Sequence, residues 1–293
     1  MQHAYPNKDP DGFVGLRYWA PPEELRNYFG SIYLFTANLP AYHDVTRADM
    51  PQMRFMMCGG GYYKFQTDVC MDTPQVCMLG PTMGATEFFL DSRASVFGVS
   101  VLPLGWAALG NESADLWTDR LYDMAQMHGP QFQSMLEILR NEKDPDAAVS
   151  QIWPFLAAQL TPVSRETEDM VIAIDHWLRE SASPQIEDLV AATGLSARQI
   201  ARHTNRLYGA SPKLLSRKYR ALRCAGQIVI DRKTWRELCD EGTFYDQPHF
   251  IREIKQFFGL TPHQLLNDPT EVARLTVQRR AMTGLLAELN RIS

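Results

Sequence analysis

The chain has 293 residues, of which 45% are hydrophobic and 22% charged, and a formal net charge of −5. This composition excludes an intrinsically disordered chain and gives room for two domains with hydrophobic cores. No stretch reaches the roughly 18–20 apolar residues of a membrane-spanning helix, and the N-terminus lacks a signal peptide pattern, so we expect a cytoplasmic protein without membrane contact.

The first third of the chain has the pattern of a β-rich unit. Residues 1–30 are rich in Pro, Gly and polar groups, and short apolar runs follow. Turn residues such as Gly59–Gly61 and Gly80-Pro81 separate these runs, which predicts mostly antiparallel strands. The predicted strands cover residues 31–36, 53–58, 62–66, 75–79, 86–90 and 95–102.

From Trp106 onward the apolar period changes from two toward 3.6, which predicts helices. Pro145 and Pro162 mark breaks between them, because the residue before a proline is pushed out of the helical conformation. We expect a hinge at residues 181–184, where Ser, Ala and Pro cluster. The predicted helices cover residues 115–127, 130–140, 146–159 and 165–180.

Residues 185–266 contain the same unit twice. The segment DLVAATGLSARQIARHTNRLYGASPKLL begins at Asp188, and ELCDEGTFYDQPHFIREIKQFFGLTPHQLL begins at Glu237. The offset between the copies is 49 residues up to the turn and 50 after it. Each copy has the pattern of a short helix, a tight turn and a longer helix closed by Gly, which predicts a helix-turn-helix DNA-binding motif.

The charge is divided unevenly between the two parts of the chain. Residues 181–293 hold 17 Lys+Arg and 11 Asp+Glu, a net charge of +6, which leaves residues 1–180 with 12 and 23, a net charge of −11. Between Asp188 and Asp231 there are eight Lys or Arg and no acid. The positive potential of this segment attracts phosphate. Because the segment coincides with the repeat, we interpret it as a DNA-binding surface and not as an ordinary solvated basic face.

The longer helix of the first copy has one apolar and one polar face. Ser196 is placed to cap this helix. Arg198, Gln199 and Arg202 lie on the polar face and are candidates for base contacts, because such side chains fork onto guanine and adenine edges. The candidates for phosphate contacts are Ser196, Asn205 and Arg206.

In the second copy, Asp246 is the predicted cap of the longer helix. Pro248 falls in its first turn, where the missing N–H costs nothing. Ile251 is placed to meet a thymine methyl group, although an exposed aliphatic residue is also commonplace. The candidates for base contacts are Gln247, His249, Ile251 and Arg252, and the candidate for phosphate is Lys255.

The segments GLSARQIARHTNRLYGASP and FYDQPHFIREIKQFFGLTP resemble the paired helix-turn-helix domain of AraC/XylS transcription regulators, over about residues 183–267. The most specific part is F-x-D-Q-x-H-F at Phe244–Phe250, closed by Gly-x-[ST]-Pro at Gly259–Pro262. The resemblance implies a transcription regulator, more commonly an activator. Its two helix-turn-helix motifs, called the first and second head below, bind successive major grooves about 34 Å apart. RNA polymerase is an expected partner. The helix between the heads is expected to hold phosphate through Arg217, Lys218 and Arg220.

The segments PPEELRNYFGSIY, LGPTMGATEFFL and VFGVSVLPLGWAALGNESADLWTDR resemble an N-terminal domain often fused to AraC-type heads, over roughly residues 15–160. The resemblance implies that this part senses a small molecule, dimerises or does both. Response to a protein partner in place of a small molecule stays open. With core packing as the competing interpretation, the candidate lining residues of an effector pocket are Trp19, Tyr62, Tyr63, Phe65, Trp106 and Trp117.

Signatures of catalysis are missing from the sequence. It has no G-x-S-x-G, G-x-x-x-x-G-K-[ST] or G-x-G-x-x-G motif of the relevant kind, and the histidines before residue 180 lack metal-site spacing. Tyr42-His43-Asp44 is interpreted as a surface loop. We therefore expect no catalytic residue, metal or cofactor, and an enzyme domain fused to a DNA anchor is the weaker alternative. Without CxxC spacing, we interpret the cysteines as buried small hydrophobes: Cys58, Cys70, Cys77, Cys224 and Cys239.

The residues from Thr270 to Ser293 predict a helix with one apolar seam through Leu275, Met282 and Leu289. We expect this helix to pack against the second head, while a homodimer stays open. The sequence thus predicts an α+β protein in which a β-rich regulatory domain with following helices precedes an all-α domain with two helix-turn-helix motifs. The expected parts are a regulatory or sensor domain at 1–162, a linker helix and hinge at 163–184, the DNA-binding domain at 185–267 and a helical extension at 268–293.

Overall fold

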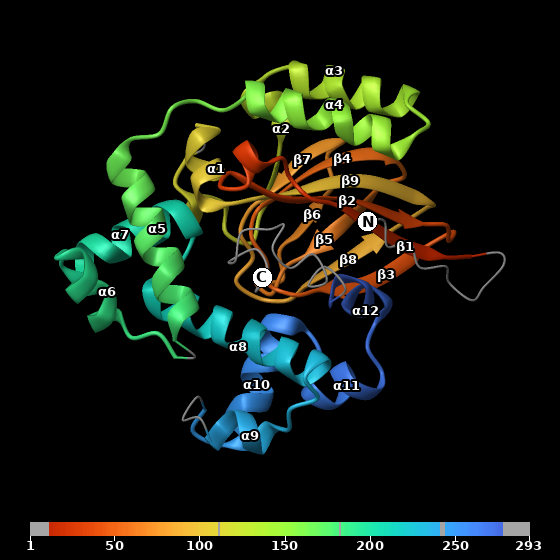
Figure 1. The fold of residues 1–293 in the computed structure, drawn as a ribbon. Helices are drawn as coiled ribbons and strands as arrows, with labels where there is room; N and C mark the ends of the chain where they lie inside the picture. The colour runs from red at the N-terminus through yellow and green to blue at the C-terminus, as the bar shows by residue number, and fades with distance from the viewer. Residues whose placement is uncertain (1–11, 111, 182, 241–243, 278–293) are drawn as a thin grey trace.

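The computed structural model of the chain describes residues 12–110, 112–181, 183–240 and 244–277. It confirms the α+β class, with a β-rich N-terminal part followed by helices (Figure 1). The predicted helical seam beyond residue 277, with Met282 and Leu289, lies outside the described residues.

The larger of two sheets is antiparallel and has the strand order β1-β2-β9-β4-β7-β10. Apolar and β-branched side chains dominate these strands, as expected for a pleated, largely buried surface. In the centre, Phe97 lies opposite Leu34 on one side and Phe55 on the other. The strands are β1 (Val14–Trp19), β2 (Phe29–Ala37), β4 (Gln52–Cys58), β7 (Val76–Leu79), β9 (Ala94–Val101) and β10 (Leu121–Asp123).

The smaller sheet is also antiparallel, with the order β3-β8-β5-β6. A Cβ on Gly61 would lie 1.8 Å from the Phe89 carbonyl oxygen, so only glycine lets β5 approach β8 at this point. The strands are β3 (Tyr42–Thr46), β5 (Gly61–Lys64), β6 (Cys70–Asp72) and β8 (Thr86–Leu90).

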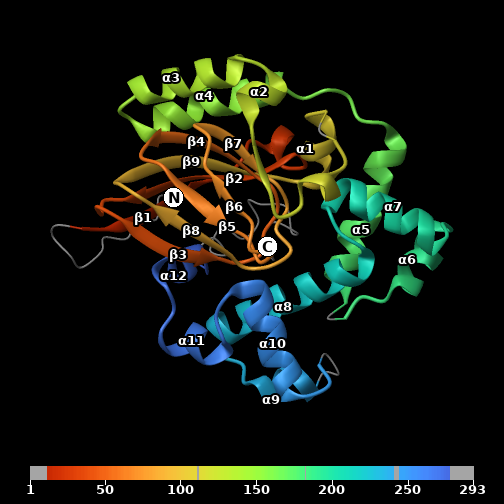
Figure 2. The same ribbon diagram turned by 180° about the vertical axis from the view of Figure 1, so that it is seen from behind.

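Alternation along the strands gives the larger sheet two different faces. On β4, Met53 and Phe55 belong to the hydrophobic core, whereas Gln52, Arg54 and Met56 line a cavity on the opposite face. The helices α2 (Met124–His128), α3 (Gln131–Asn141) and α4 (Pro145–Ala158) follow this sheet, and α3 and α4 cover its core face (Figures 1 and 2). The other face turns toward the smaller sheet.

The six predicted strands are confirmed as β2, β4, β5, β7, β8 and β9. The predicted helix over 115–127 is wrong: this segment forms the 3₁₀ turn η2 (Ala114–Trp117), then β10 and the short α2. Tyr42-His43-Asp44 is part of β3, not a loop. The polar side chains of this segment do not give the apolar pattern of a strand, yet the segment pairs with β8 along its full length.

Most of the remaining helices form the C-terminal part of the molecule. The 19-residue α8 is roughly 28 Å long at 1.5 Å per residue. In both views α6 and α7 lie near one end of α8, and α9 and α10 lie toward its other end (Figures 1 and 2). No helix in the described ranges is long and apolar enough to cross a membrane. These helices are α1 (Pro103–Ala108), α5 (Arg165–Glu180), α6 (Ile186–Thr193), α7 (Ala197–Tyr208), α8 (Pro212–Ile230), α9 (Trp235–Asp240), α10 (Gln247–Phe258), α11 (Pro262–Asn267) and α12 (Glu271–Val277).

Candidate DNA-binding surface and effector cavity

The first head is α6, a tight turn and α7. Gly194 ends α6 in the left-handed conformation, with φ of 69°. Ser196 then caps α7, as predicted: its side chain accepts from the Gln199 backbone N–H, and the Gln199 amide oxygen accepts from Ser196. Gly209 closes α7, again with a positive φ, of 79°. The local sequence therefore fixes both ends of the helix.

Most of the predicted positions at the start and along the polar face of α7 are exposed to solvent. Arg198 and Arg202, one helical turn apart, are both exposed. Gln199 is exposed as well, but its amide oxygen is engaged in the capping box. Asn205 is half-buried, and Arg206 donates a 2.8 Å hydrogen bond to Thr167 Oγ1 of α5. Arg198 and Arg202 thus form the outward cationic face of the first head, while Arg206, although exposed, is held toward α5.

The second head contains α9 and α10. Asp246 caps α10 by accepting a hydrogen bond from the His249 backbone N–H at 2.7 Å, as predicted. Gln247, Arg252 and Lys255 are exposed on this helix. His249 is half-buried, with Nε2 3.5 Å from Glu253 Oε1. Ile251 packs partly against the core of the head, and His249 against Phe244. The outward set is therefore smaller than the sequence predicted.

Two phosphate candidates on α8 are engaged inside the protein. Arg217 Nε lies 2.5 Å from Glu253 Oε1, and Arg220 Nη2 lies 2.6 Å from Glu253 Oε2. Glu253 is only 2% exposed. This triad fixes α10 against α8, so both arginines contribute to the packing of the second head. Glu253, which sequence reasoning missed, is the sole acid in the sequence of α10.

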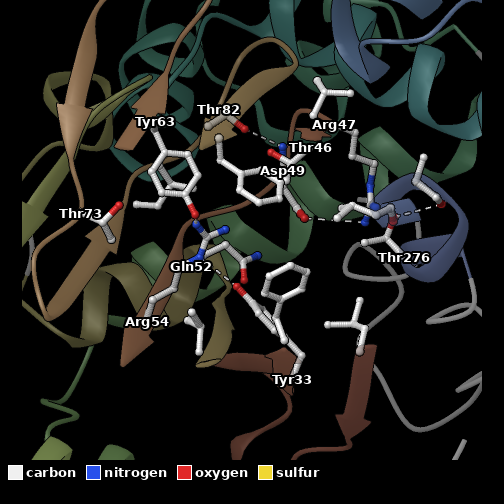
Figure 3. A pocket seen from close by; sticks show the side chains of 18 of the residues that line it. Tyr33, Thr46, Arg47, Asp49, Gln52, Arg54, Tyr63, Thr73, Thr82 and Thr276 are labelled. Carbon is white, nitrogen blue, oxygen red and sulfur yellow. Dashed lines mark hydrogen bonds and ion pairs between the residues drawn. The ribbon is translucent and has the colours of Figure 1, made fainter. Parts of the chain in front are cut away.

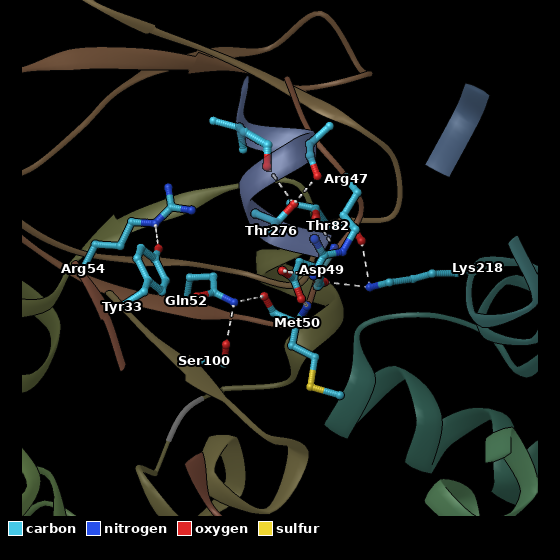
Figure 4. A network of polar contacts seen from close by, with 12 residues as sticks. Tyr33, Arg47, Asp49, Met50, Gln52, Arg54, Thr82, Ser100, Lys218 and Thr276 are labelled. Atoms are coloured by element: carbon cyan, nitrogen blue, oxygen red, sulfur yellow. Dashed lines mark hydrogen bonds and ion pairs between the residues drawn. The ribbon is translucent and has the colours of Figure 1, made fainter. Parts of the chain in front are cut away.

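Lys218, the third phosphate candidate on α8, is buried. It is 1% exposed, and its Nζ donates to the carbonyl oxygens of Asp49 at 2.6 Å and Thr82 at 2.9 Å. Figure 4 shows the side chain reaching from α8 to this loop region. Burial lowers the pKa of Lys218 to about 8. Lys218 therefore ties the helix between the heads to the β-rich part.

Main-chain contacts also tie both heads to the β-rich part. The Gly209 carbonyl accepts a 2.7 Å hydrogen bond from Thr118 Oγ1. At the end of α10, the Phe257 carbonyl accepts from the Ala48 N–H at 2.6 Å, and the Gln256 carbonyl accepts from the Ala85 N–H at 2.9 Å. Each head is thus anchored to the β-rich part at the C-terminal end of its longer helix.

A half-buried acid, Asp175, links α7 to α5. The Tyr208 hydroxyl donates to Asp175 Oδ1 at 2.5 Å. Burial raises the pKa of Asp175 to about 7, although the bond from Tyr208 acts in the opposite direction. The folded protein therefore binds a proton here that the unfolded chain releases near pH 4.

We expect the free energy of unfolding to fall as pH rises from about 4 to 7, because the folded state binds more protons than the unfolded state in that window. Asp175→Asn should remove this part of the pH dependence, on the order of 2–4 kcal/mol for a three-unit shift. Urea denaturation at pH 4.5, 6 and 8 measures it, with the exposed Asp169→Asn as the control. Equal pH slopes for parent and Asp175→Asn would contradict the assignment.

A cavity lies between the two sheets and holds about 1020 Å³ of empty space, counting the part open to solvent (Figure 3). The larger sheet contributes Tyr33, Gln52 and Arg54, and the smaller sheet contributes Val45 and Phe88. Phe258 of α10 and residues of α12 complete the lining. The cavity is therefore shared between the β-rich part and the second head.

Arg54 is the charged lining residue that forms no ion pair with the described residues. It is 8% exposed; its Nε donates to the Tyr33 hydroxyl at 2.9 Å and its Nη1 donates to the Tyr63 hydroxyl. Burial acts to lower the pKa of Arg54, but the two phenols more than offset it, so the pKa lies above its usual value. Burial raises the pKa of Tyr63 to about 12, so this phenol stays neutral at pH 7.

Of the six aromatic pocket candidates, Tyr63 lines the cavity. Trp106 is in the core under the helices, and Phe65 belongs to a separate small core. Trp19 donates to Asp146 at the start of α4, Trp117 packs against Tyr122, and Tyr62 stacks on Phe89 at the surface. Aromatic content alone did not show which face of a strand each ring occupies. A polar Arg54 inside the apolar run MRFMMC was the available signal for the cavity face.

The cysteines are not uniformly buried. Cys77 and Cys224 are buried, as interpreted, but Cys58 and Cys70 are exposed. These two lie at strand ends, where the sheet no longer covers them. Within the described part of the chain, no group of three or more His, Cys, Asp or Glu is arranged to hold a metal ion.

Comparison with known proteins gives a match for the C-terminal part. A helix-turn-helix domain model matches residues 189–268, from within α6 of the first head to the end of α11. This part of the chain is therefore a DNA-binding helix-turn-helix domain. It is of the AraC type, which confirms the resemblance found in the sequence.

Solved structures with a similar arrangement were also found. ToxT of Vibrio cholerae with bound unsaturated fatty acid has 10% identity and a TM-score of 0.45, covering 91% of this chain and 100% of that chain. The AraC-like transcriptional activator CuxR has 14% identity and a TM-score of 0.32, covering 74% and 82%. An oxalate decarboxylase of Bacillus subtilis has 10% identity and a TM-score of 0.27, covering 34% and 27%. No curated protein matches the chain.

Proposed function

We propose that the protein is a sequence-specific transcription regulator whose α7 and α10 each enter a major groove of double-stranded DNA. The observation that carries this proposal is the exposed cationic face on each capped helix, with Arg198 and Arg202 in the first head and Arg252 and Lys255 in the second. Arginine can form two parallel hydrogen bonds with a guanine edge, and lysine neutralises phosphate. Activation of transcription, with RNA polymerase as a partner, remains the expected mode.

We further propose that a small molecule in the cavity controls the heads. Phe258 lines the cavity from α10, so a molecule bound there touches the second head directly. Asp49 and Thr82 line it too, and their carbonyls hold Lys218 of α8. Any shift of this loop region on binding therefore acts on the helix that joins the heads. The differential contact with α10 and α8 is what couples the cavity to DNA binding.

Selection of bound duplexes from a random pool tests the DNA-binding role. The full chain should enrich an asymmetric motif with two parts about one helical turn apart, since one protomer carries both heads. The same selection in the presence of a cell extract should change the recovery or the spacing of the motif if a small molecule acts. Recovery of unrelated sequences at high salt would contradict sequence-specific binding.

A further inference from the structure

We propose that the cavity binds a small apolar carboxylic acid as its anion, with the carboxylate paired to Arg54. This inference rests on the proposed control of the heads by an effector and names the chemical class of that effector. It follows from the charge, the unpaired polar atoms and the apolar surroundings of the cavity.

The charge in the cavity is unbalanced. Of the charged lining residues, Arg47 and Asp49 form an ion pair at 3.6 Å. Arg54 has only the phenols of Tyr33 and Tyr63 as hydrogen-bond partners, and no carboxylate among the described residues forms an ion pair with it. The Arg54 cation therefore has no counter-charge among the described residues, and an anion bound beside it would supply one.

The guanidinium also has the geometry to hold a carboxylate. Its Nε and Nη1 are used by the two phenols, whereas Nη2 has no hydrogen-bond partner within the described part of the chain. Figure 3 shows Arg54 beside Gln52 and Tyr33 in the wall of the cavity. The Nη2 hydrogens and the phenol hydroxyls are therefore the groups available to a ligand's oxygen atoms.

A second polar group in the same wall is unsatisfied. The amide nitrogen of Gln52 donates to Ser100 Oγ at 3.0 Å (Figure 4), while its buried amide oxygen has no partner in the described part of the chain. Gln52 is 2% exposed and lies two residues before Arg54 on the same face of β4. A carboxylate has no hydrogen to donate to this oxygen, so Gln52 makes this wall polar without binding the anion itself, and Arg54 and the two phenols are the donors that would hold it.

The remaining lining favours an apolar body. Away from Arg54 the cavity is surrounded by aliphatic and aromatic side chains from both sheets and from α10 and α12. An apolar chain or ring gains free energy in proportion to the area that it buries there. The side chains concerned are Leu16, Phe35, Val45, Phe88, Leu90, Val96, Phe258 and Val272.

Calorimetric titration of the full chain with decanoate and 2-naphthoate tests the proposal, with decanamide and 2-naphthamide as uncharged counterparts. We expect at least one carboxylate to bind at least about tenfold more tightly than its amide, as a charge-assisted hydrogen bond provides. Arg54→Gln should weaken carboxylate binding at least about tenfold and leave amide binding unchanged, which also shows that the cavity has folded. Arg54→Lys should have an affinity for the carboxylate between those of the parent and Arg54→Gln. Replacement of the exposed Arg93 by Gln should leave the affinity unchanged.

Two outcomes overturn the proposal. One is that neither carboxylate binds more tightly than its amide, and the other is that Arg54→Gln binds the carboxylate as tightly as the parent. Each titration is paired with binding of the selected duplex without ligand. If the duplex binds and no carboxylate does, the ligand class fails while the regulator role stands. If a carboxylate binds and no duplex is selected, the regulator role fails instead.

Discussion

Replacement of Arg198 by Ala should weaken binding to the selected duplex by about 1–3 kcal/mol, and replacement of Arg202 should do the same. Both side chains are exposed on one face of α7, whose start is fixed by the Ser196 capping box. Each loss corresponds to roughly fivefold to 150-fold in the dissociation constant. If the two arginines touch different bases, the losses add in the double variant. Fluorescence anisotropy at fixed salt measures them.

The same variants separate base reading from phosphate contact. A variant that has lost a base contact should no longer discriminate at one position of the motif, whereas loss of a phosphate contact weakens all sequences equally and lowers the salt dependence. Arg165→Ala, an exposed arginine on α5, is the matched control and should bind like the parent. The assignment of α7 as a reading helix is wrong if the double variant retains full affinity and selectivity.

Replacement of Glu253 by Ala should destabilise the protein by about 3 kcal/mol. The change leaves Arg217 and Arg220 without the carboxylate that now bridges them, and breaking a buried ion pair by removing one partner typically costs about 3–5 kcal/mol. We expect the lower end, because the Arg217 side chain is 35% exposed and gains water. The expected loss is a large share of the roughly 5–15 kcal/mol that stabilise a typical protein. Urea denaturation at pH 7 measures it.

The pH dependence gives a second test of this triad. Burial acts to raise the pKa of Glu253, but hydrogen bonds from Arg220 and Arg217 outweigh it, so the pKa lies below its usual value. The stabilisation is therefore present above about pH 4.3 and is lost as pH falls through the lower, folded pKa. Glu187→Ala, an exposed acid on α6, is the control and should change stability by less than about 0.5 kcal/mol. A similar value for Glu253→Ala would mean that the arginines find other partners.

Local patterns predicted the elements of the heads well because short-range chemistry determines them. Ser196 and Asp246 are capping residues followed at once by helical sequence, and Gly209 and Gly259 adopt the positive φ that ends each helix. The alternation of apolar residues likewise predicted β2, β4 and β9. Each of these signals lies within a few residues of the structure that it specifies.

The roles of charged side chains were harder to predict because their partners are distant in sequence. Lys218 stands in a run without acids, which is typical of a phosphate-binding helix, yet its partners Asp49 and Thr82 are 169 and 136 residues away. Arg217 and Arg220 find Glu253 only after α10 folds back on α8. A charge count shows the field of a segment, but tertiary packing decides which charges still face solvent.

The anchoring of α10 through backbone carbonyls has a consequence for how such a protein can diversify. The Phe257 and Gln256 carbonyls bond to Ala48 and Ala85 whatever side chains the helix carries. Under the proposed function, substitutions at Gln247, Arg252 and Lys255 would alter the preferred operator while the inter-domain attachment persists. Duplicated copies of the gene would then be free to acquire new targets and still respond to the proposed effector.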